Sequence, residues 1–455
     1  MRSMSYRPAP LLSQSGLDLF DPVAAADFPQ AVLRCRNARA ARGVGLDALS
    51  DADWINHFGC FAPLPDNQPQ PLALRYHGHQ FRHYNPDLGD GRGFLFAQMY
   101  DGDHRLLDLG TKGSGRTPYS RGGDGRLTLK GGVREVLATA MLEALGVPTS
   151  KSFSLIETGE ALTRGDEPSP TRSSVLVRLS HSHIRFGTFE RLAFLNDADT
   201  MRGLVAFIRE HYYPDAENAA GLFDAIAANT ARLAARWMAA GFVHGVLNTD
   251  NMNVTGESFD YGPYRFLPSY QPGFTAAYFD HTGLYAYARQ PDAVLWNLGQ
   301  LGRCLSLITD SEPLVASLNS FAGRYQNELE QAFCARLGVV PTGADEALIA
   351  AFFTLAYGLR FDGAFEGLIY DACTRRLGDS PRAGHYRGPE FDAFKAALDA
   401  YEPMHRKHPR LLQPDPETLL YDEIEAIWAR IAEADDWSLF DAKLAAIDIY
   451  REALA

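Results

Sequence analysis

The segment from His244 to residue 262 places hard oxygen donors in two neighbouring loops. It reads HGVLNTDN and continues, nine residues after Asn251, with Asp-Tyr-Gly at 260–262. Mg²⁺ prefers oxygen ligands, and Asn251 together with Asp260 supplies two of them. This order of residues predicts a metal-bound nucleotide held between the two loops. The alternative is an Asn/Asp-rich turn that binds no metal.

The same segment resembles the catalytic loop of protein kinases in spacing but lacks its catalytic aspartate. Asn251 follows His244 by seven residues, which is the separation in the kinase motif. The kinase aspartate would stand two residues after the histidine, where this chain has Val246. Asp250 is the only carboxylate nearby, and we interpret it as the candidate proton acceptor for a substrate hydroxyl.

A lysine and a glutamate occur in the order that kinase-like folds use to hold nucleotide phosphates. Lys112 ends a predicted strand, and Glu135 lies on the helix predicted to follow. In such folds the strand lysine contacts the phosphates and the helix glutamate orients it. Two solvated surface charges are the alternative.

Two arginines stand in or beside an apolar strand. Arg178 stands near the end of the run VLVRL, and Arg185 follows in SHSHIRFGTF. A buried guanidinium requires acceptors, which a polyphosphate or an internal salt bridge would provide. His181 and His183 are expected in the core or a loop, because no carboxylate or cysteine stands at metal-ligand spacing.

A glycine-rich segment, Gly89-Asp-Gly91-Arg92-Gly93, precedes a predicted hairpin. Glycines let backbone N–H groups approach phosphate oxygens, and Arg92 adds a charged donor. The spacing fits neither the Walker nor the dinucleotide-binding fingerprint. A tight turn between strands remains the alternative.

The elements that must position these residues follow in a recognisable order. Strands are predicted at 94–100 and 105–110 around a turn at 101–103, then a helix at 131–146, then strands at 152–157 and 174–179. From about Leu192 the pattern becomes helical, with Leu222, Ile226, Leu233 and Trp237 on one helix that ends at Gly241. Further amphipathic helices are predicted from about residue 292.

This order predicts an α+β, two-lobed protein-kinase-like fold. Residues 1–191 would form an N-terminal extension and a small β-rich N-lobe that binds nucleotide. Residues 192–455 would form the larger helical C-lobe, with the catalytic and metal loops and a helical C-terminal region. The nucleotide would lie between the lobes.

Composition excludes several other classes of protein. The chain has 455 residues, 46% of them hydrophobic, and a net charge of -13. The hydrophobic content is therefore sufficient for a large core. Because the net charge is negative, binding to nucleic acid or to an anionic membrane surface is not expected. Five cysteines without a CxxC pair, and no apolar run near the N-terminus or elsewhere that suits a signal peptide or a bilayer span, indicate a cytoplasmic protein.

Joined together, these motifs resemble the selenoprotein O family of kinase-like protein adenylyltransferases, called YdiU in bacteria. The resemblance runs from about Tyr76 to Phe266 through YHGHQF, NPDLGDGRG, DLGTKGSGRTPYSRGGDGR, REVLATAMLEALGVPT, SHIRFGTFE, GFVHGVLNTDNMNV and DYGPY. It implies transfer of AMP from ATP to Ser, Thr or Tyr hydroxyls of protein substrates, with ATP bound in the reverse orientation to that in kinases.

The resemblance also assigns roles residue by residue. Nucleotide-binding positions fall on Gly89, Gly91, Arg92, Lys112, Asp124, Gly125, Arg178, Arg185 and Asp260. Asp250 matches the proton acceptor, Asn251 and Asp260 match the ligands of Mg²⁺ or Mn²⁺, and Glu135 matches the partner of the lysine.

The chain departs from the family pattern in two places. His77 and Arg82 stand where the family usually has Ala and Gly, in the loop ahead of the glycine motif. Many members end with a redox-active cysteine or selenocysteine, whereas the last cysteine here is Cys373, so redox control by a C-terminal thiol is not expected.

Three other activities remain open from the sequence. They are UMP transfer from UTP with Mn²⁺, phosphoryl transfer by an atypical kinase that uses Asp250 as its base, and an ATP-binding pseudokinase that acts as a scaffold.

Overall fold

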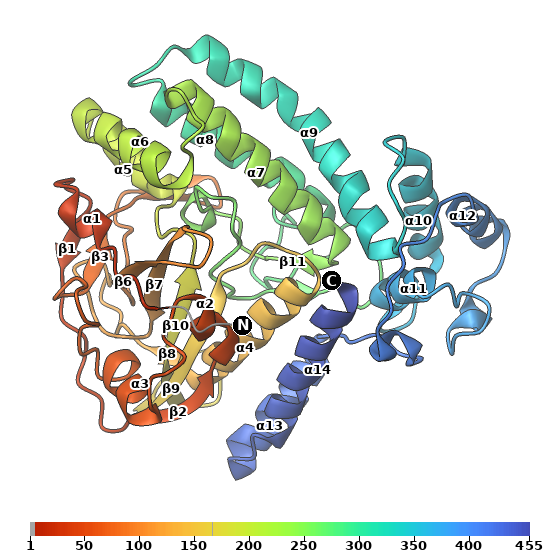
Figure 1. Cartoon of the computed structure of the whole chain (residues 1–455), viewed down its shortest axis with the longest axis horizontal. Helices are drawn as coiled ribbons and strands as arrows, with labels where there is room; N and C mark the ends of the chain where they lie inside the picture. Colours follow the sequence, from red (N-terminus) through yellow and green to blue (C-terminus); the bar gives the residue numbers. More distant parts are fainter. Residues whose placement is uncertain (1–4, 166) are drawn as a thin grey trace.

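The computed structural model describes residues 5–165 and 167–455 and combines one antiparallel sheet with many helices (Figure 1). The strands of the main sheet lie between residues 20 and 180, and from residue 186 onward most of the chain is helical. The mixed α and β composition is thus confirmed. The kinase-like arrangement of two lobes stays a prediction.

The main sheet has eight strands in the order β1-β3-β6-β7-β10-β9-β2, with β8 paired to β10. Its strands are β1 (Phe20–Pro22), β2 (Val32–Arg36), β3 (Leu72–Leu74), β6 (Leu95–Tyr100), β7 (Leu106–Lys112), β8 (Leu127–Thr128), β9 (Lys151–Leu162) and β10 (Thr171–Ser180). Two separate pairs are β4 (Gly78–Gln80) with β5 (His83–Asn85), and β11 (Phe242–Val243) with β12 (Arg265–Phe266).

The predicted hairpin is confirmed as β6 and β7, and the register of the next pair brings two predicted site residues together. Leu176 of β10 lies opposite Lys112, and Arg178 lies opposite Gly110. Because directly opposed residues share a face and side chains alternate along a strand, Lys112 and Arg178 project from the same face of the sheet. Strands β9 and β10 extend several residues beyond the predicted ranges, as a longer hairpin.

Helix α4 (Leu129–Ala144) confirms the predicted helix and begins two residues earlier than expected. The Thr128 side chain accepts a hydrogen bond from the Gly131 backbone N–H, which caps the first turn. Val133, Leu137 and Met141 are buried, as their four-residue spacing indicates.

The helical half starts earlier than predicted. Helix α5 (Phe186–Phe194) includes residues that were expected outside the helices, and the domain boundary expected at residue 191 falls inside it. Glycine has a low helix propensity, so Gly187 weakens the helical pattern of this segment. A Cβ at this position would overlap the backbone carbonyl of His77, so glycine permits close packing of α5 against the segment ahead of β4.

The remaining helices are α1 (Leu11–Gln14), α2 (Ala38–Gly43), α3 (Asp51–Phe58), α6 (Ala198–Tyr212), α7 (Ala219–Ala239), α8 (Gln290–Leu305), α9 (Ser311–Leu337), α10 (Glu346–Gly358), α11 (Ala364–Cys373), α12 (Pro389–Asp399), α13 (Tyr421–Ala434) and α14 (Ser438–Leu454). Helices α7 and α9 lie side by side, and the last two helices return to α4 (Figure 1). One buried apolar cluster accordingly includes residues of α4, α7, α8, α13 and α14.

None of the helices in the described ranges combines the length and the apolar character that crossing a membrane would require.

Candidate active site

A cavity of about 580 Å³ brings together most of the residues predicted to act on a nucleotide. Its lining includes the predicted residues Gly89, Gly91, Arg92, Lys112, Asp124, Gly125, Arg178, Arg185, Asp250 and Asp260. These residues come from the glycine segment before β6, from β7 and β10, from the loop between β7 and β8, from the residue that precedes α5, and from the loops after β11. Glu135 lies behind Lys112, and Asn251 is not among the lining residues.

Lys112 stands at the centre of a buried ionic network. Its ammonium group pairs with Glu135 Oε1 of α4 and lies 2.6 Å from Asp260 Oδ1. The side chains of Lys112 and Glu135 are almost fully buried, so the alternative of two solvated surface charges is wrong. Glu135 Oε2 is also buried and has no hydrogen-bond partner within the described part of the chain.

Asp260 has an unusual backbone conformation and a strongly stabilised charge. Its φ is +64°, in the left-handed region that aspartate tolerates better than most residues. Burial alone would raise the pKa of this carboxyl, but nearby positive charges outweigh burial and hold the pKa well below its ordinary value. The charges are those of Lys112, Arg178, Arg92 and Arg185. Asp260 is therefore ionised at neutral pH and can bind a cation.

Arg178 and Arg185 are both buried, yet their hydrogen-bonding capacity is only partly used. Arg178 Nη1 is 3.7 Å from Asp260 Oδ1, and this nitrogen has no hydrogen-bond partner among residues 5–165 and 167–455. Arg185 donates to the Asp250 backbone carbonyl at 3.0 Å and lies over the Tyr76 ring, but its Nε is likewise unpaired there. Contacts within the chain thus use only some of the N–H donors of these two guanidinium groups. The remaining donors are available to an anion.

The glycine segment is tightly packed. A Cβ on Gly89 would overlap the ring of Tyr119, and one on Gly91 would lie 2.9 Å from the Tyr119 carbonyl oxygen. Close packing is therefore one reason for these glycines. Their backbone also lines the cavity, as a phosphate-binding loop requires.

Asp124 and Gly125 lie at another part of the same cavity. Gly125 has a φ of +70°, and a Cβ there would overlap the backbone of Gly115. Asp124 forms an ion pair with Arg164 at 2.7 Å. Although burial opposes it, hydrogen bonding with Arg164 helps to lower the pKa of Asp124.

Asp250 is the one predicted catalytic residue, and its carboxylate is poorly satisfied. The residue lies in a short 3-10 turn, Thr249–Asn251, and is 9% exposed. Its Oδ1 atom is buried and lacks a hydrogen-bond partner in the described structure. Burial raises the pKa of Asp250 to about 7, although the charge of Arg185 opposes the shift. Such a group suits proton transfer near neutral pH.

The donor set fits a divalent cation held partly by substrate phosphates. Asn251 Nδ2 donates to the Val246 carbonyl at 2.9 Å, which fixes the side chain and leaves its oxygen available. No cluster of three or more His, Cys, Asp or Glu ligands occurs in the described ranges. Mg²⁺ commonly uses only one or two carboxylates together with phosphate oxygens, and the carboxylate of Asp260, which lines the cavity, is compatible with such a site.

Several lining residues were not predicted. Asp90 belongs to the glycine segment itself; it accepts a hydrogen bond from the Leu74 backbone N–H and pairs with Arg185 at 3.4 Å. Tyr76 opens the segment YHGHQF, and its ring lies under the Arg185 guanidinium. Arg164 lies outside every motif, and its role emerges only from its contact with Asp124.

Comparison with known proteins identifies relatives along almost the entire chain. A family model described as "Protein adenylyltransferase SelO" matches residues 2–377. A "Protein nucleotidyltransferase YdiU" of Trichormus variabilis is 50% identical over 361 residues, covering 78% of this chain and 73% of the relative. Proteins of the same name from Gloeobacter violaceus and Trichodesmium erythraeum are 46% and 43% identical. Both alignments cover 96% of this chain, and they cover 93% and 97% of the relatives, respectively.

Proposed function

Because the chain belongs to the SelO family, we propose that its cavity binds ATP and that AMP is transferred to Ser, Thr or Tyr hydroxyls of protein substrates. Family membership makes the chain a protein nucleotidyltransferase. The proposal adds the nucleotide, the acceptor group and the roles of individual residues. It also adds the kinase-like fold, in which the sheet and the helical half form two lobes around the nucleotide.

The observation that carries this proposal is the position of Lys112 between Glu135 and Asp260, beside two arginines with unused donors. A polyphosphate entering the cavity would meet Lys112 and Arg178 from one face of the sheet, Arg185 from the start of α5, and the backbone of the glycine segment. This arrangement suits a phosphate chain better than it suits a singly charged ligand.

The proposed chemistry follows from where negative charge develops. The acceptor oxygen bonds to the α-phosphorus, the bond from that phosphorus to the bridging oxygen breaks, and pyrophosphate leaves. Lys112 and the arginines stabilise the charge that grows on the leaving group. A bound Mg²⁺ or Mn²⁺, held by Asp260 and Asn251, would neutralise phosphate charge. Asp250 orients the hydroxyl and takes its proton.

The cell compartment and the partners belong to the same proposal. The five cysteines are all free in residues 5–165 and 167–455, which agrees with a reducing compartment, and we propose that the protein acts in the cytoplasm. Its partners would be ATP and proteins with accessible hydroxyl groups.

The test compares two labels on ATP. Purified protein is incubated with Mg²⁺ and a candidate acceptor protein, using ATP labelled on the α-phosphate or on the γ-phosphate. We expect label in protein only from the α-position, together with a mass increase of one AMP on Ser, Thr or Tyr. Label from the γ-position alone would identify a kinase instead, and ATP-induced thermal stabilisation without label would identify a pseudokinase. Competition by UTP tests whether the protein prefers ATP or UTP as the nucleotide that it transfers from.

A further inference from the structure

The last two helices of the chain lie against α4, the helix that carries Glu135 (Figure 1). They are α13 and α14, and both lie beyond residue 377, where the match to the family model ends. Their apolar side chains join the buried cluster that contains the core face of α4; these are Ile424, Ile427 and Ile431 of α13 and Phe440, Ile447 and Tyr450 of α14. The end of the chain therefore contributes directly to the packing of α4.

Helix α13 contacts both α4 and the segment that follows Asp260. Glu425 Oε2 lies 2.7 Å from Lys130 Nζ in the first turn of α4. The Arg265 guanidinium lies over the Tyr421 ring, 3.9 Å from its centroid. One helix thus contacts α4, which carries Glu135, and β12, which begins five residues after Asp260.

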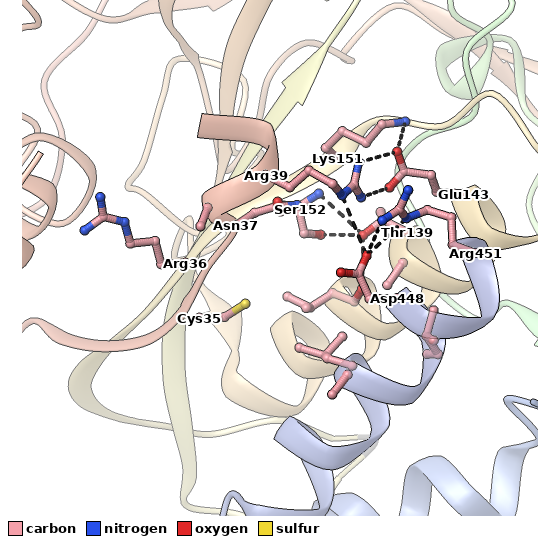
Figure 2. Close-up of a pocket in the computed structure, with 16 residues that line it drawn as sticks. Cys35, Arg36, Asn37, Arg39, Thr139, Glu143, Lys151, Ser152, Asp448 and Arg451 are labelled. Atoms are coloured by element: carbon pink, nitrogen blue, oxygen red, sulfur yellow. Dashed lines mark hydrogen bonds and ion pairs between the residues drawn. The ribbon is translucent and has the colours of Figure 1, made fainter. Parts of the chain in front are cut away.

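Helix α14 faces the other end of α4 across a cavity of about 300 Å³ (Figure 2). Glu143 of α4 pairs with Arg39 of α2, and Arg39 Nε is 3.7 Å from Asp448 Oδ1 of α14. Asp448 also pairs with Arg451 on its own helix at 2.8 Å. Figure 2 shows these charged side chains converging between the helices. A chain of alternating charges therefore connects α4 to α14.

The opposite side of α14 is fixed to the helical half. The Tyr450 hydroxyl donates to Glu366 Oε1 of α11 at 2.8 Å, and the second Glu366 oxygen pairs with Arg336 of α9. All three side chains are buried. Because α14 contacts α4 on one side and α11 on the other, it limits movement of α4 relative to the helical half.

The position of α4 matters because Glu135 reaches Lys112 only when the helix lies against the sheet. We propose that α13 and α14 hold α4 in this position, so that nucleotide transfer depends on helices near the end of the chain. Lys130 and Glu425 are then positioning residues: they act on the phosphates through Glu135 and Lys112. The inference rests on the proposed function for its catalytic consequence.

A charge swap between α4 and α13 tests the proposal. The variants are Lys130→Glu, Glu425→Lys and the double exchange. Each single change places like charges opposite one another, whereas the double change restores an ion pair in reverse. We expect kcat for AMP transfer to fall roughly threefold to tenfold in the single variants, with a smaller change in KM for ATP, and to recover in the double variant.

Hydrogen exchange provides the readout that is independent of activity. Backbone amides of residues 129–144 should exchange faster in the single variants and return towards the wild-type rate in the double variant. A matched control is Glu328→Lys, which disrupts a comparable ion pair with Arg232 between α7 and α9. It should leave both kcat and the exchange of α4 unchanged.

The possible failures can be told apart. Unchanged exchange in α4, or an unchanged kcat despite faster exchange, would overturn the positioning role, as would a double variant that does not recover. If the wild-type protein takes no label from the α-phosphate, the proposed function is wrong. The positioning of α4 by α13 and α14 is then judged by two other readouts. In the single variants exchange in α4 must become faster and thermal stabilisation by MgATP must fall, and both must return towards the wild-type values in the double variant.

Discussion

The ammonium group of Lys112 lies 2.6 Å from Asp260 Oδ1 while it also pairs with Glu135. One cation therefore connects α4 to the loop that would hold the metal. When a nucleotide binds with its metal, Lys112 is expected to turn towards the phosphates and leave Asp260 to the cation. Glu135 remains as the partner that keeps the lysine in place.

This relationship predicts the effect of removing the Asp260 carboxylate. In Asp260→Ala, AMP transfer should fall at least about a hundredfold, because a metal ligand is lost from the transition state. Stability should fall by only about 1 kcal/mol, since Lys112 retains Glu135 as its counter-ion. Label transfer from α-labelled ATP and denaturant unfolding measure the two effects. A folded variant that retains activity would contradict the metal assignment.

Replacing Asp250 should separate catalysis from nucleotide binding. Asp250→Asn keeps the shape of the side chain but cannot take up the proton of the acceptor. We expect the transfer rate to fall about 10²-fold to 10⁴-fold, whereas thermal stabilisation by MgATP persists. Equal loss of both would show that Asp250 acts in binding the nucleotide or its metal rather than in proton transfer.

Four neighbouring strands of the sheet, β6, β7, β10 and β9, and helix α4 could be predicted because their signals are local. The turn at 101–103 and the apolar repeat Val133, Leu137, Met141 specify β6, β7 and α4 almost by themselves. Helix α5 was missed because Gly187 weakens the helical pattern, and the close approach of His77 that explains this glycine is a contact between distant segments. Sequence patterns do not encode such contacts.

The site residues could be predicted to a similar extent. Lys112 and Asp260 stand in motifs whose chemistry is evident, and the structure brings them together. Arg164 has no motif, and it reaches the cavity by pairing with Asp124. The contacts of α13 with α4 were also beyond prediction, because nearly 300 residues separate Lys130 from Glu425.

Two glycines with similar backbone conformations should respond differently to alanine. Gly122 and Gly125 have φ values of +82° and +70°, but a Cβ on Gly122 meets no atom within 4 Å, whereas one on Gly125 overlaps the Gly115 backbone. Gly122→Ala should cost about 1 kcal/mol from backbone strain alone.

Gly125→Ala should cost roughly 1–3 kcal/mol more, because the backbone around the cavity must move, and should weaken ATP binding. Denaturant unfolding and ATP titration measure both effects, with Gly122→Ala as the matched control. Equal losses of stability in the two variants would exclude the steric explanation.

The final prediction concerns the dependence of stability on pH. Burial, with the charge of Arg105, lowers the pKa of His181 to about 4, while Asp101 opposes the shift. Because an unfolded histidine titrates near pH 6.5, the unfolded chain binds more protons than the folded chain between pH 6.5 and 4. The contribution of His181 to the free energy of unfolding is therefore present above pH 6.5 and is lost as the pH falls towards 4.

His181 packs edge-on against Tyr212, and leucine at this position would keep apolar contact without titrating. Between pH 7.5 and pH 5, the wild-type protein should lose roughly 2 kcal/mol more unfolding free energy than His181→Leu. Urea unfolding of both proteins at the two pH values measures this difference. Parallel losses in the two proteins would mean that His181 does not resist protonation in the folded state, and that other groups control stability in acid.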